Sequence, residues 1–369
     1  MSEKNQREDL LAKARGEINE IDAQMAELFV RRMRAAEEIA AYKKEHALPI
    51  FDAAREEQVV QANAKLVEDD TLREYYVNFI RNNMAVSRAY QSRLLEGMRV
   101  AYCGTEGAFA HIAAGKMFPG SVRVAYADFV SAYRAVENGE CDAAVLPVEN
   151  SYNGEVGQVT DLMFSGSLYV NGTYDLAVVH DLLVLPGTRI DEIKTVVSHA
   201  QALAQCTPFI RAHGFKEIEY VNTALAAEYV AQKGDKSLAA IASEDAAERY
   251  GLEIAANGIN ENRNNTTRFA VVSRVRNKAP AVRGMDMRFI LMFTVKNEAG
   301  SLAKAIDIIG KHGYNMGSLR SRPMKELLWQ YYFYVEAEGN IDTEDGKAML
   351  AELSSVCDQL KIIGSYAKN

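Results

Sequence analysis

The chain has 369 residues, 48% of them hydrophobic and 25% charged, which is typical of a folded protein with two or three domains and excludes a disordered one. A formal net charge of −8 argues against a nucleic-acid partner. The polar start MSEKNQREDL and the lack of an apolar run near the roughly 20 residues of a membrane span predict no signal peptide, no membrane contact and a cytoplasmic protein. The 4 cysteines and 6 histidines are scattered without a C-x-x-C pair, so we expect free thiols and no metal.

Residues 1–96 predict three helices, the first of them long. Apolar residues recur at helical spacing between Ile18 and Phe29, and Pro49 and the turn at Asp69–Thr71 interrupt the pattern. The polar residues that stand out on this segment are Arg15, Arg32, Lys43, Asp52, Arg55, Glu56, Ser87 and Gln91.

Helical geometry decides which of these cations can share a ligand. Arg32 and Lys43 fall on nearly the same helix face, about 16 Å apart along the axis. Arg15 lies 17 residues before Arg32, about 25 Å away, so it can join such a site only from a second subunit. On these residues alone, a solvated charged face is the simpler interpretation.

The spacing of the whole set resembles that of the all-α, AroQ-like chorismate mutases. It reads R-x6-D from Arg15, R-x10-K from Arg32, P-x2-D-x2-R-E from Pro49 and S-x3-Q from Ser87. The resemblance implies an interlocked dimer in which Arg15 crosses the interface. It also implies that Arg15 and Arg32 hold carboxylates of chorismate, that Lys43 and Gln91 face its ether oxygen, and that the remaining residues of the set complete the pocket. The rearrangement to prephenate is pericyclic and needs charge stabilisation but no nucleophile, which cations alone can supply.

Residues 97–277 predict an α/β domain with a largely parallel sheet, because short apolar runs such as RVAYC and LAAIAS alternate with helical patterns. The extended stretch from Ser167 to Gly187 is expected to cross between two lobes. Polar motifs are expected at the C-terminal ends of the strands, where open α/β sheets bind small anions. These motifs are GTEGAFAHIAA, LPVENSYNGEV, SHAQALAQC, NTALAAEYV and NNTTRF.

Several of these residues have a plain structural alternative. Ser198 and Thr223 are most simply helix N-caps, and His199 is either a packing residue or a site residue. The glycine pair Gly104 and Gly107 does not form G-x-G-x-x-G, so neither a dinucleotide fold nor a nicotinamide cofactor is expected.

Together and in this order, the motifs resemble prephenate dehydratase, most specifically at N-x-T-R-F, Asn265 to Phe269. The resemblance implies two lobes like those of type 2 periplasmic binding proteins, with the active site between them. Thr267 would donate a hydrogen bond or proton to the leaving hydroxyl of prephenate. The further substrate contacts would be Glu149, Asn150, Ser151, Ser198, His199, Thr223, Asn265, Arg268 and Phe269.

Two roles stay open at this point, and one residue departs from the family. Arg268 is an anion grip or a structural partner, and Glu149 is a rival proton donor or an orienting group. Ala110 stands where the family usually has serine or threonine, so one hydroxyl of the first lobe is missing.

Residues 284–369 predict the order βαββαβ, with a first strand at Met287–Val295 and a third at Trp329–Ala337, which is a ferredoxin-like module. The segment resembles an ACT domain and is therefore expected to bind L-phenylalanine between two copies. The matching residues are Gly300, Ser301, Leu302, Ala303, Asn315, Met316, Arg320, Ser321, Arg322 and Pro323. Arg320 replaces a family glutamate, so feedback could be weakened or changed, or the charge could be absorbed by a neighbour. An inert dimerisation module is the alternative.

The sequence therefore predicts a cofactor-free, bifunctional enzyme, a homodimer or larger, that converts chorismate to prephenate and then to phenylpyruvate under feedback by L-phenylalanine. A sensor of small acids without catalysis is the alternative from another class. A chain with only one working site is a third possibility, supported only by Ala110.

Overall fold

The computed structural model describes residues 3–262, 264–278, 286–324 and 330–367. It divides into two compact units, the first ending at Met98 and the second beginning at Arg99. The predicted start of the last segment at residue 284 and the predicted strand start at Trp329 lie outside the described residues. Within the described ranges, no helix is long and apolar enough to cross a bilayer.

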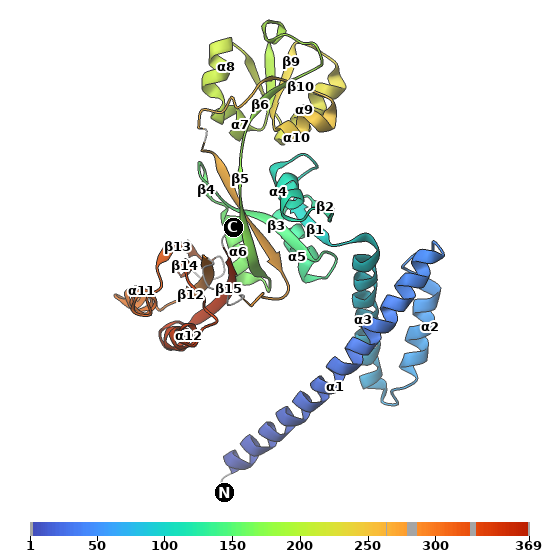
Figure 1. The fold of residues 1–369 in the computed structure, drawn as a ribbon. Helices are drawn as coiled ribbons and strands as arrows, with labels where there is room; N and C mark the ends of the chain where they lie inside the picture. Colours follow the sequence, from blue (N-terminus) through green and yellow to red (C-terminus); the bar gives the residue numbers. More distant parts are fainter. Residues whose placement is uncertain (1–2, 263, 279–285, 325–329, 368–369) are drawn as a thin grey trace. The chain divides into compact units, whose positions relative to one another are not determined.

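The first unit consists of three helices, as predicted: α1 (Glu3–Glu45), α2 (Ala53–Ala64) and α3 (Asp70–Glu96) (Figure 1). Asp52 caps α2 by accepting a 3.0 Å hydrogen bond from the Arg55 amide, and Asp69 caps α3 in the same way. The N-terminal half of α1 extends beyond the other two helices. Its apolar stripe, defined here as Leu10, Leu11, Ile18, Ile21, Met25, Leu28 and Phe29, is exposed by between 42% and 66% per residue.

The second unit contains two lobes whose sheets follow the same plan. The first-lobe sheet has the order β2-β1-β3-β11-β5, in which β11 runs against its neighbours, and the short β4 pairs antiparallel with β3 off this order. The second-lobe sheet has the order β8-β7-β9-β6-β10, and only β6 does so. The prediction of largely parallel sheets is therefore confirmed, with one inserted antiparallel strand in the five-strand order of each lobe.

The first lobe is built from β1 (Arg99–Cys103), α4 (Phe109–Met117), β2 (Val122–Tyr126), α5 (Phe129–Glu137), β3 (Ala143–Asn150), β4 (Gly154–Glu155), α6 (Gly157–Ser165), β5 (Tyr169–Ala177) and β11 (Thr266–Ser273). The second lobe is built from β6 (Asp181–Val184), η1 (Ile190–Glu192), β7 (Thr195–Ser198), α7 (Ala200–Gln205), α8 (Thr207–His213), β8 (Lys216–Glu219), α9 (Thr223–Lys233), β9 (Leu238–Ala242), α10 (Glu244–Tyr250) and β10 (Glu253–Ala256). The chain enters the second lobe between β5 and β6, which is the predicted crossover, and returns between β10 and β11.

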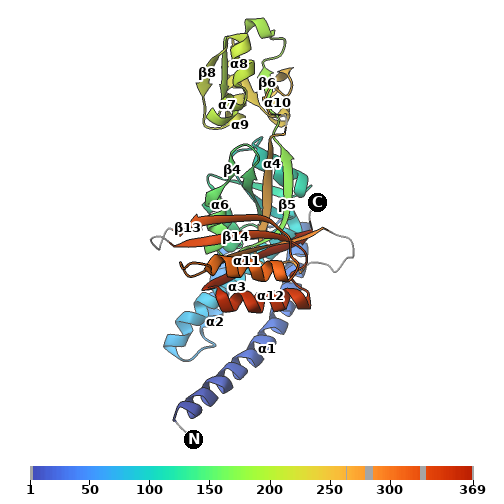
Figure 2. The ribbon, with the colours of Figure 1, turned by 90° about the vertical axis from the view of Figure 1, so that its left-hand side faces the viewer.

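The C-terminal segment forms β12 (Met287–Thr294), α11 (Ser301–Lys311), β13 (Met316–Pro323), β14 (Tyr331–Glu338), α12 (Glu344–Val356) and β15 (Gln359–Ala367). Its antiparallel sheet has the order β13-β14-β12-β15, with α11 and α12 on one face (Figure 2). The other face shares a core with the first lobe, where Ile290 and Tyr332 lie in the same buried cluster as Met163 and Ala270.

One glycine lets the C-terminal sheet continue that of the first lobe. Gly364 of β15 pairs with Val170 of β5, and a Cβ on Gly364 would lie 2.0 Å from the Val170 carbonyl oxygen. Any side chain at this position would push the two sheets apart. The sequence did not predict this continuous sheet, because a single backbone pairing between distant segments leaves no pattern in the chain.

Candidate functional site

A cavity of ≈ 280 Å³ lies between the two lobes, at the edge of the sheets where the polar motifs gather. The predicted residues that line it are Asn150, His199, Thr223, Asn265 and Thr267. It is also lined by residues that the sequence analysis did not select, namely Phe109, His180, Gln201, Gln205 and Asn222.

Thr267 lies at this edge of the sheet, but at the opposite end of its strand from the predicted one. NNTTRF was expected at the C-terminal end of a strand, which is wrong, since Thr266 begins β11. Because β11 is antiparallel to β3, its first residues lie beside the last ones of β3, and Thr267 pairs with Asn150. The inserted antiparallel strand thus places both motifs together.

Directed hydrogen bonds join the amides beneath the cavity. The Asn150 Oδ1 accepts 3.0 Å bonds from the backbone amides of Tyr152 and Asn153, which fixes the orientation of the side chain. The Asn150 Nδ2 must then donate, and it does so to Asn265 Oδ1 and to Thr267 Oγ1, both at 2.9 Å. The Thr267 hydroxyl therefore accepts from Asn150 and keeps its own proton for another acceptor.

The two helix caps at the cavity differ from the predicted ones by one residue each. His199, not Ser198, caps α7, and Asn222, not Thr223, caps α9. The Ser198 hydroxyl is fully buried and donates to the Ile241 carbonyl at 2.5 Å, which does not bring it to the cavity lining. With Phe109 at the start of α4, the first turns of three helices line the cavity.

The other predicted contacts lie outside the lining. Ser151 is exposed and bonds to the Asn264 carbonyl and the Thr266 amide, and Phe269 is packed in the core at 2% exposure. Ala110 is buried in the first turn of α4, so the position of the missing hydroxyl is also not part of the lining.

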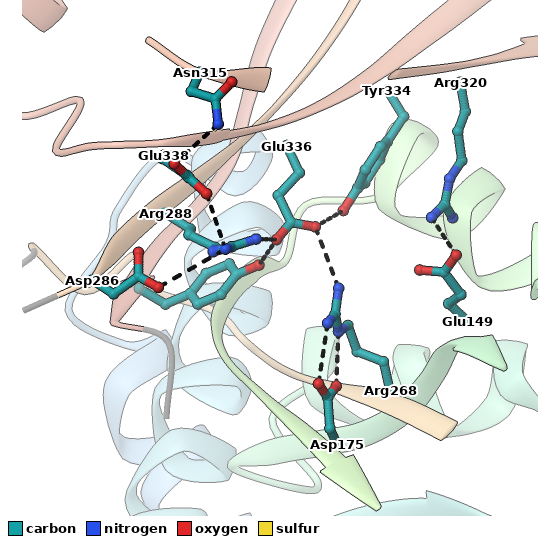
Figure 3. A network of polar contacts seen from close by, with 11 residues as sticks. Glu149, Asp175, Arg268, Asp286, Arg288, Asn315, Arg320, Tyr334, Glu336 and Glu338 are labelled. Carbon is teal, nitrogen blue, oxygen red and sulfur yellow. Dashed lines mark hydrogen bonds and ion pairs between the residues drawn. The ribbon is translucent and has the colours of Figure 1, made fainter. Parts of the chain in front are cut away.

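Arg268 and Glu149 point toward the C-terminal module instead of the cavity (Figure 3). Arg268 donates two hydrogen bonds to Asp175, at 2.8 and 3.1 Å, and lies 3.9 Å from Glu336 of β14. The hydrogen bonds to Asp175 raise the pKa of Arg268 above its ordinary value. Of the two roles left open for Arg268, the observed geometry corresponds to the structural pairing.

Arg320 forms a 2.6 Å ion pair with Glu149, and the two side chains are 26% and 35% exposed (Figure 3). Arg322, two residues further along β13, pairs with Asp161 of α6 at 2.9 Å. Because side chains alternate along a strand, both arginines face the first lobe, while Ser321 between them faces away and is exposed. The reversed charge is thus absorbed by a neighbouring glutamate.

The other residues predicted to be regulatory lie at two places in the same module. Gly300 has φ +85°, a left-handed conformation that favours glycine, and it begins α11 ahead of Ser301, Leu302 and Ala303. Met316 and Pro323 are the ends of β13, and the preceding Asn315 donates to Glu338 at 3.1 Å.

In the helical unit, Arg32 on α1 meets α3. Its guanidinium donates to the Asn83 carbonyl at 3.1 Å and contacts the Ser87 hydroxyl, and burial lowers its pKa. Gln91, one turn beyond Ser87, is buried, and its Oε1 has no hydrogen-bond partner among the described residues. Lys43 contacts the Ile50 carbonyl.

The predicted residues of α2 lie beside this group, and Arg15 does not. Asp52 and exposed Arg55 form the cap of α2, and Glu56 pairs with Arg88 of α3. Arg15 is exposed on the same uninterrupted helix as Arg32, so it stays about 25 Å away within one chain.

A larger cavity of ≈ 800 Å³ also lies between the lobes, but its lining is acidic. Among the described residues of this lining, Asp175, Asp181, Glu244 and Asp245 outnumber the one cation, Lys116. Such a lining repels a dicarboxylate, whereas the described lining of the smaller cavity carries no acidic side chain.

Comparison with known proteins matches one family to the helical unit and another to the two lobes. Residues 14–92 match the family Chorismate mutase type II, and residues 100–277 match the family Prephenate dehydratase. A bifunctional chorismate mutase/prephenate dehydratase of Enterobacter agglomerans is 30% identical over 95% of this chain and 94% of its own length.

Two solved structures are similar over 73% of this chain. One is GqqA, described as a novel type of quorum quenching acylase, with 31% identity, 98% of its chain covered and a TM-score of 0.68. The other is a prephenate dehydratase of Arthrobacter aurescens in complex with L-Phe, with 26% identity, 90% of its chain covered and a TM-score of 0.67. With a full-length relative and both domain families matched, the chain belongs to the bifunctional chorismate mutase/prephenate dehydratases, enzymes of phenylalanine biosynthesis.

Proposed function

We propose that the ≈ 280 Å³ cavity is the prephenate dehydratase site and that Thr267 donates to the hydroxyl that leaves. The observation that carries this proposal is the direction of one hydrogen bond: Asn150 donates to Thr267 Oγ1, so the threonine proton is left to the substrate. Loss of water and carbon dioxide makes the ring aromatic, so a modest donor suffices.

The carboxylates of prephenate would be held by the helix starts. None of the described residues that line the cavity is lysine or arginine, yet the first turns of α4, α7 and α9 meet there. Free backbone amides at helix N-termini bind anions without a side-chain cation. His199 and Thr223 would add contacts from their positions at two of these helix starts.

For the mutase, we propose that Arg32, Lys43, Arg55 and Gln91 bind chorismate together with Arg15 of a second copy, and that Asp52, Glu56 and Ser87 shape the pocket. The exposed apolar stripe of α1 supports a homodimer, because its seven residues lie on one helical face that no described residue of the chain covers. The carbonyl of Gln91, buried without a described partner, is a group that a ligand could satisfy.

For the C-terminal module, we propose a ferredoxin-like ACT domain that binds L-phenylalanine between two copies. The βαββαβ order and the glycine-led start of α11 support this assignment. Since Arg320 is directed at Glu149 and away from the face of Ser321, we expect feedback inhibition to be retained.

A time course with chorismate as the only substrate tests the proposal. Wild-type protein should form prephenate and then phenylpyruvate without added cofactor, and L-phenylalanine should suppress the second step. Thr267→Ala should accumulate prephenate, because the mutase remains and the donor is gone. Phenylpyruvate formed by this variant at the wild-type rate would remove Thr267 from the mechanism.

A further inference from the structure

Four polar side chains form one uninterrupted relay beneath the dehydratase cavity. From Thr267 it runs through Asn150 and Asn265 to Gln205, where Asn265 Nδ2 donates to Gln205 Oε1 at 2.9 Å. Asn150, Asn265 and Gln205 are 9%, 2% and 6% exposed, so water competes little for these bonds and each is strengthened by the low local dielectric. Because backbone amides fix Asn150, the direction of every later bond is also fixed.

The relay ends on His180, and its direction determines the tautomer of that histidine. Gln205 must present its carbonyl oxygen to Asn265, and the same oxygen lies 3.0 Å from His180 Nε2. A carbonyl oxygen only accepts, so Nε2 carries the proton and Nδ1 carries the lone pair in the neutral ring. Burial lowers the pKa of His180 to about 4, which keeps the ring neutral near pH 7.

The position of His180 is itself fixed by both connections between the lobes. It lies in the segment between β5 and β6, and its backbone amide and carbonyl bond to Asn260 and Ile259 of the returning segment, at 3.1 and 2.8 Å. Its ring packs edge-on against Phe109 of α4, with ring centroids 5.6 Å apart.

A histidine is a poor choice for this place if packing were its only role. The ring is 3% exposed, and its Nδ1 has no hydrogen-bond partner among the described residues, which costs free energy that leucine or phenylalanine would avoid. Unlike those residues, the histidine can donate a hydrogen bond from Nε2 to Gln205.

We propose that His180 is a positioning residue of the dehydratase: its Nε2 proton holds Gln205, and through Asn265 and Asn150 it keeps the Thr267 hydroxyl oriented with its proton toward the substrate. The inference rests on the proposed role of Thr267. Without the histidine donor, Gln205 loses the bond that holds its carbonyl oxygen beneath Asn265. The backbone amides still set the direction of the bonds, but Asn265 and Asn150 are then held less firmly in place, and the Thr267 hydroxyl with them.

Matched variants of the full-length enzyme test this role. His180→Gln keeps a hydrogen-bond donor at about the position of Nε2. His180→Leu removes the donor, and His180→Asn places its shorter side-chain amide too far from Gln205 to donate. We expect the Leu and Asn variants to lower kcat for phenylpyruvate formation about five- to tenfold, the effect of one hydrogen bond, with KM for prephenate little changed. The Gln variant should recover most of kcat. Mutase activity on chorismate and the unfolding temperature serve as folding controls in each protein.

A double variant separates positioning from packing. In a Thr267→Ala background, His180→Leu should lower kcat no further, because the end of the relay is already missing. The inference is overturned if the Leu and Asn variants keep wild-type kcat, if the Gln variant is as slow as they are, or if the losses multiply in the double variant. An unchanged kcat in Thr267→Ala alone would instead overturn the proposed function, so the two failures are distinguishable.

Discussion

The two active sites of this chain differ in what holds them together. In the helical unit, the cations among the candidate mutase residues lie on α1 and α2, and the apolar stripe of α1 is open to solvent in the single chain. In the candidate dehydratase cavity, the amides and hydroxyls of the relay are neutral, mostly buried and bonded in fixed directions. A pericyclic step needs only charge at the right place, which a second copy can provide. Directed proton donation needs oriented bonds, which a rigid single unit provides.

Removing a candidate mutase cation should have the largest effect, and it tests whether the two sites work independently. Arg32→Ala should lower mutase kcat/KM by about 10²–10³-fold, since an electrostatic group aimed at developing charge is lost from a half-buried site. Dehydratase activity on added prephenate should stay at the wild-type level. Comparable losses in both activities would show that the two sites are not independent.

Mixing two inactive variants tests whether a second copy completes the mutase site. Arg15→Ala and Arg32→Ala proteins, each nearly inactive, should regain part of the mutase activity when they are co-expressed, because a mixed dimer assembles one site with both arginines. No recovery in verified mixed dimers would mean that Arg15 serves its own chain or no site.

A charge placed in the apolar stripe should impair the mutase site by weakening the association of the helical units. Leu28 is 57% exposed in the single chain and lies near the C-terminal end of the stripe. Leu28→Asp would bury an unpaired carboxylate in a dimer, weakening association of the helical units by at least about 100-fold. Mutase activity should become dependent on protein concentration in dilution series. The control Glu57→Asp, on the exposed surface of α2, should leave the concentration dependence of the wild-type protein unchanged. A Leu28→Asp protein that keeps its mutase activity at high dilution would contradict the interface.

The neutral histidine of the dehydratase relay predicts a pH window. The pKa of His180 is lowered to about 4 from an ordinary value of 6.5, so the unfolded chain binds a proton that the folded protein does not. Stability should therefore fall as pH decreases from 6.5 toward 4, by about 2 kcal/mol at pH 5. Denaturant unfolding of His180→Gln should lack this part of the pH dependence, since the other titrating groups are the same in both proteins. An identical pH dependence in the variant would contradict a buried neutral histidine.

The sequence predicted the elements better than their contacts. Helical periodicity located the three helices, and strand and helix patterns located the C-terminal order, because these signals are local. The caps at His199 and Asn222 were missed by one residue, since a cap depends on backbone angles that residue type does not determine. The antiparallel course of β11 depends on distant pairings, which one sequence does not reveal.

The relay was missed for the same reason. Gln205 and His180 come from different segments: Gln205 is a late residue of the motif SHAQALAQC, and His180 lies outside all of the quoted motifs. One signal was available: His180 interrupts the apolar run VVHDLLV, where a polar ring is expensive to bury. A histidine in such a run predicts a buried partner, although the sequence cannot say which residue it is.

The smallest expected effect concerns the ion pair that joins the C-terminal module to the dehydratase lobe. Arg320→Glu would replace a partly exposed attraction to Glu149 by a repulsion, and we expect it to lower the free energy of unfolding by about 1 kcal/mol. Glu149→Arg alone should do the same, because it places a second guanidinium beside that of Arg320. The double variant restores opposite charges with their positions exchanged, so it should recover most of the stability, as measured by denaturant unfolding. If the two losses add instead, the pair does not act across the junction, and the reversed charge at Arg320 has some other role.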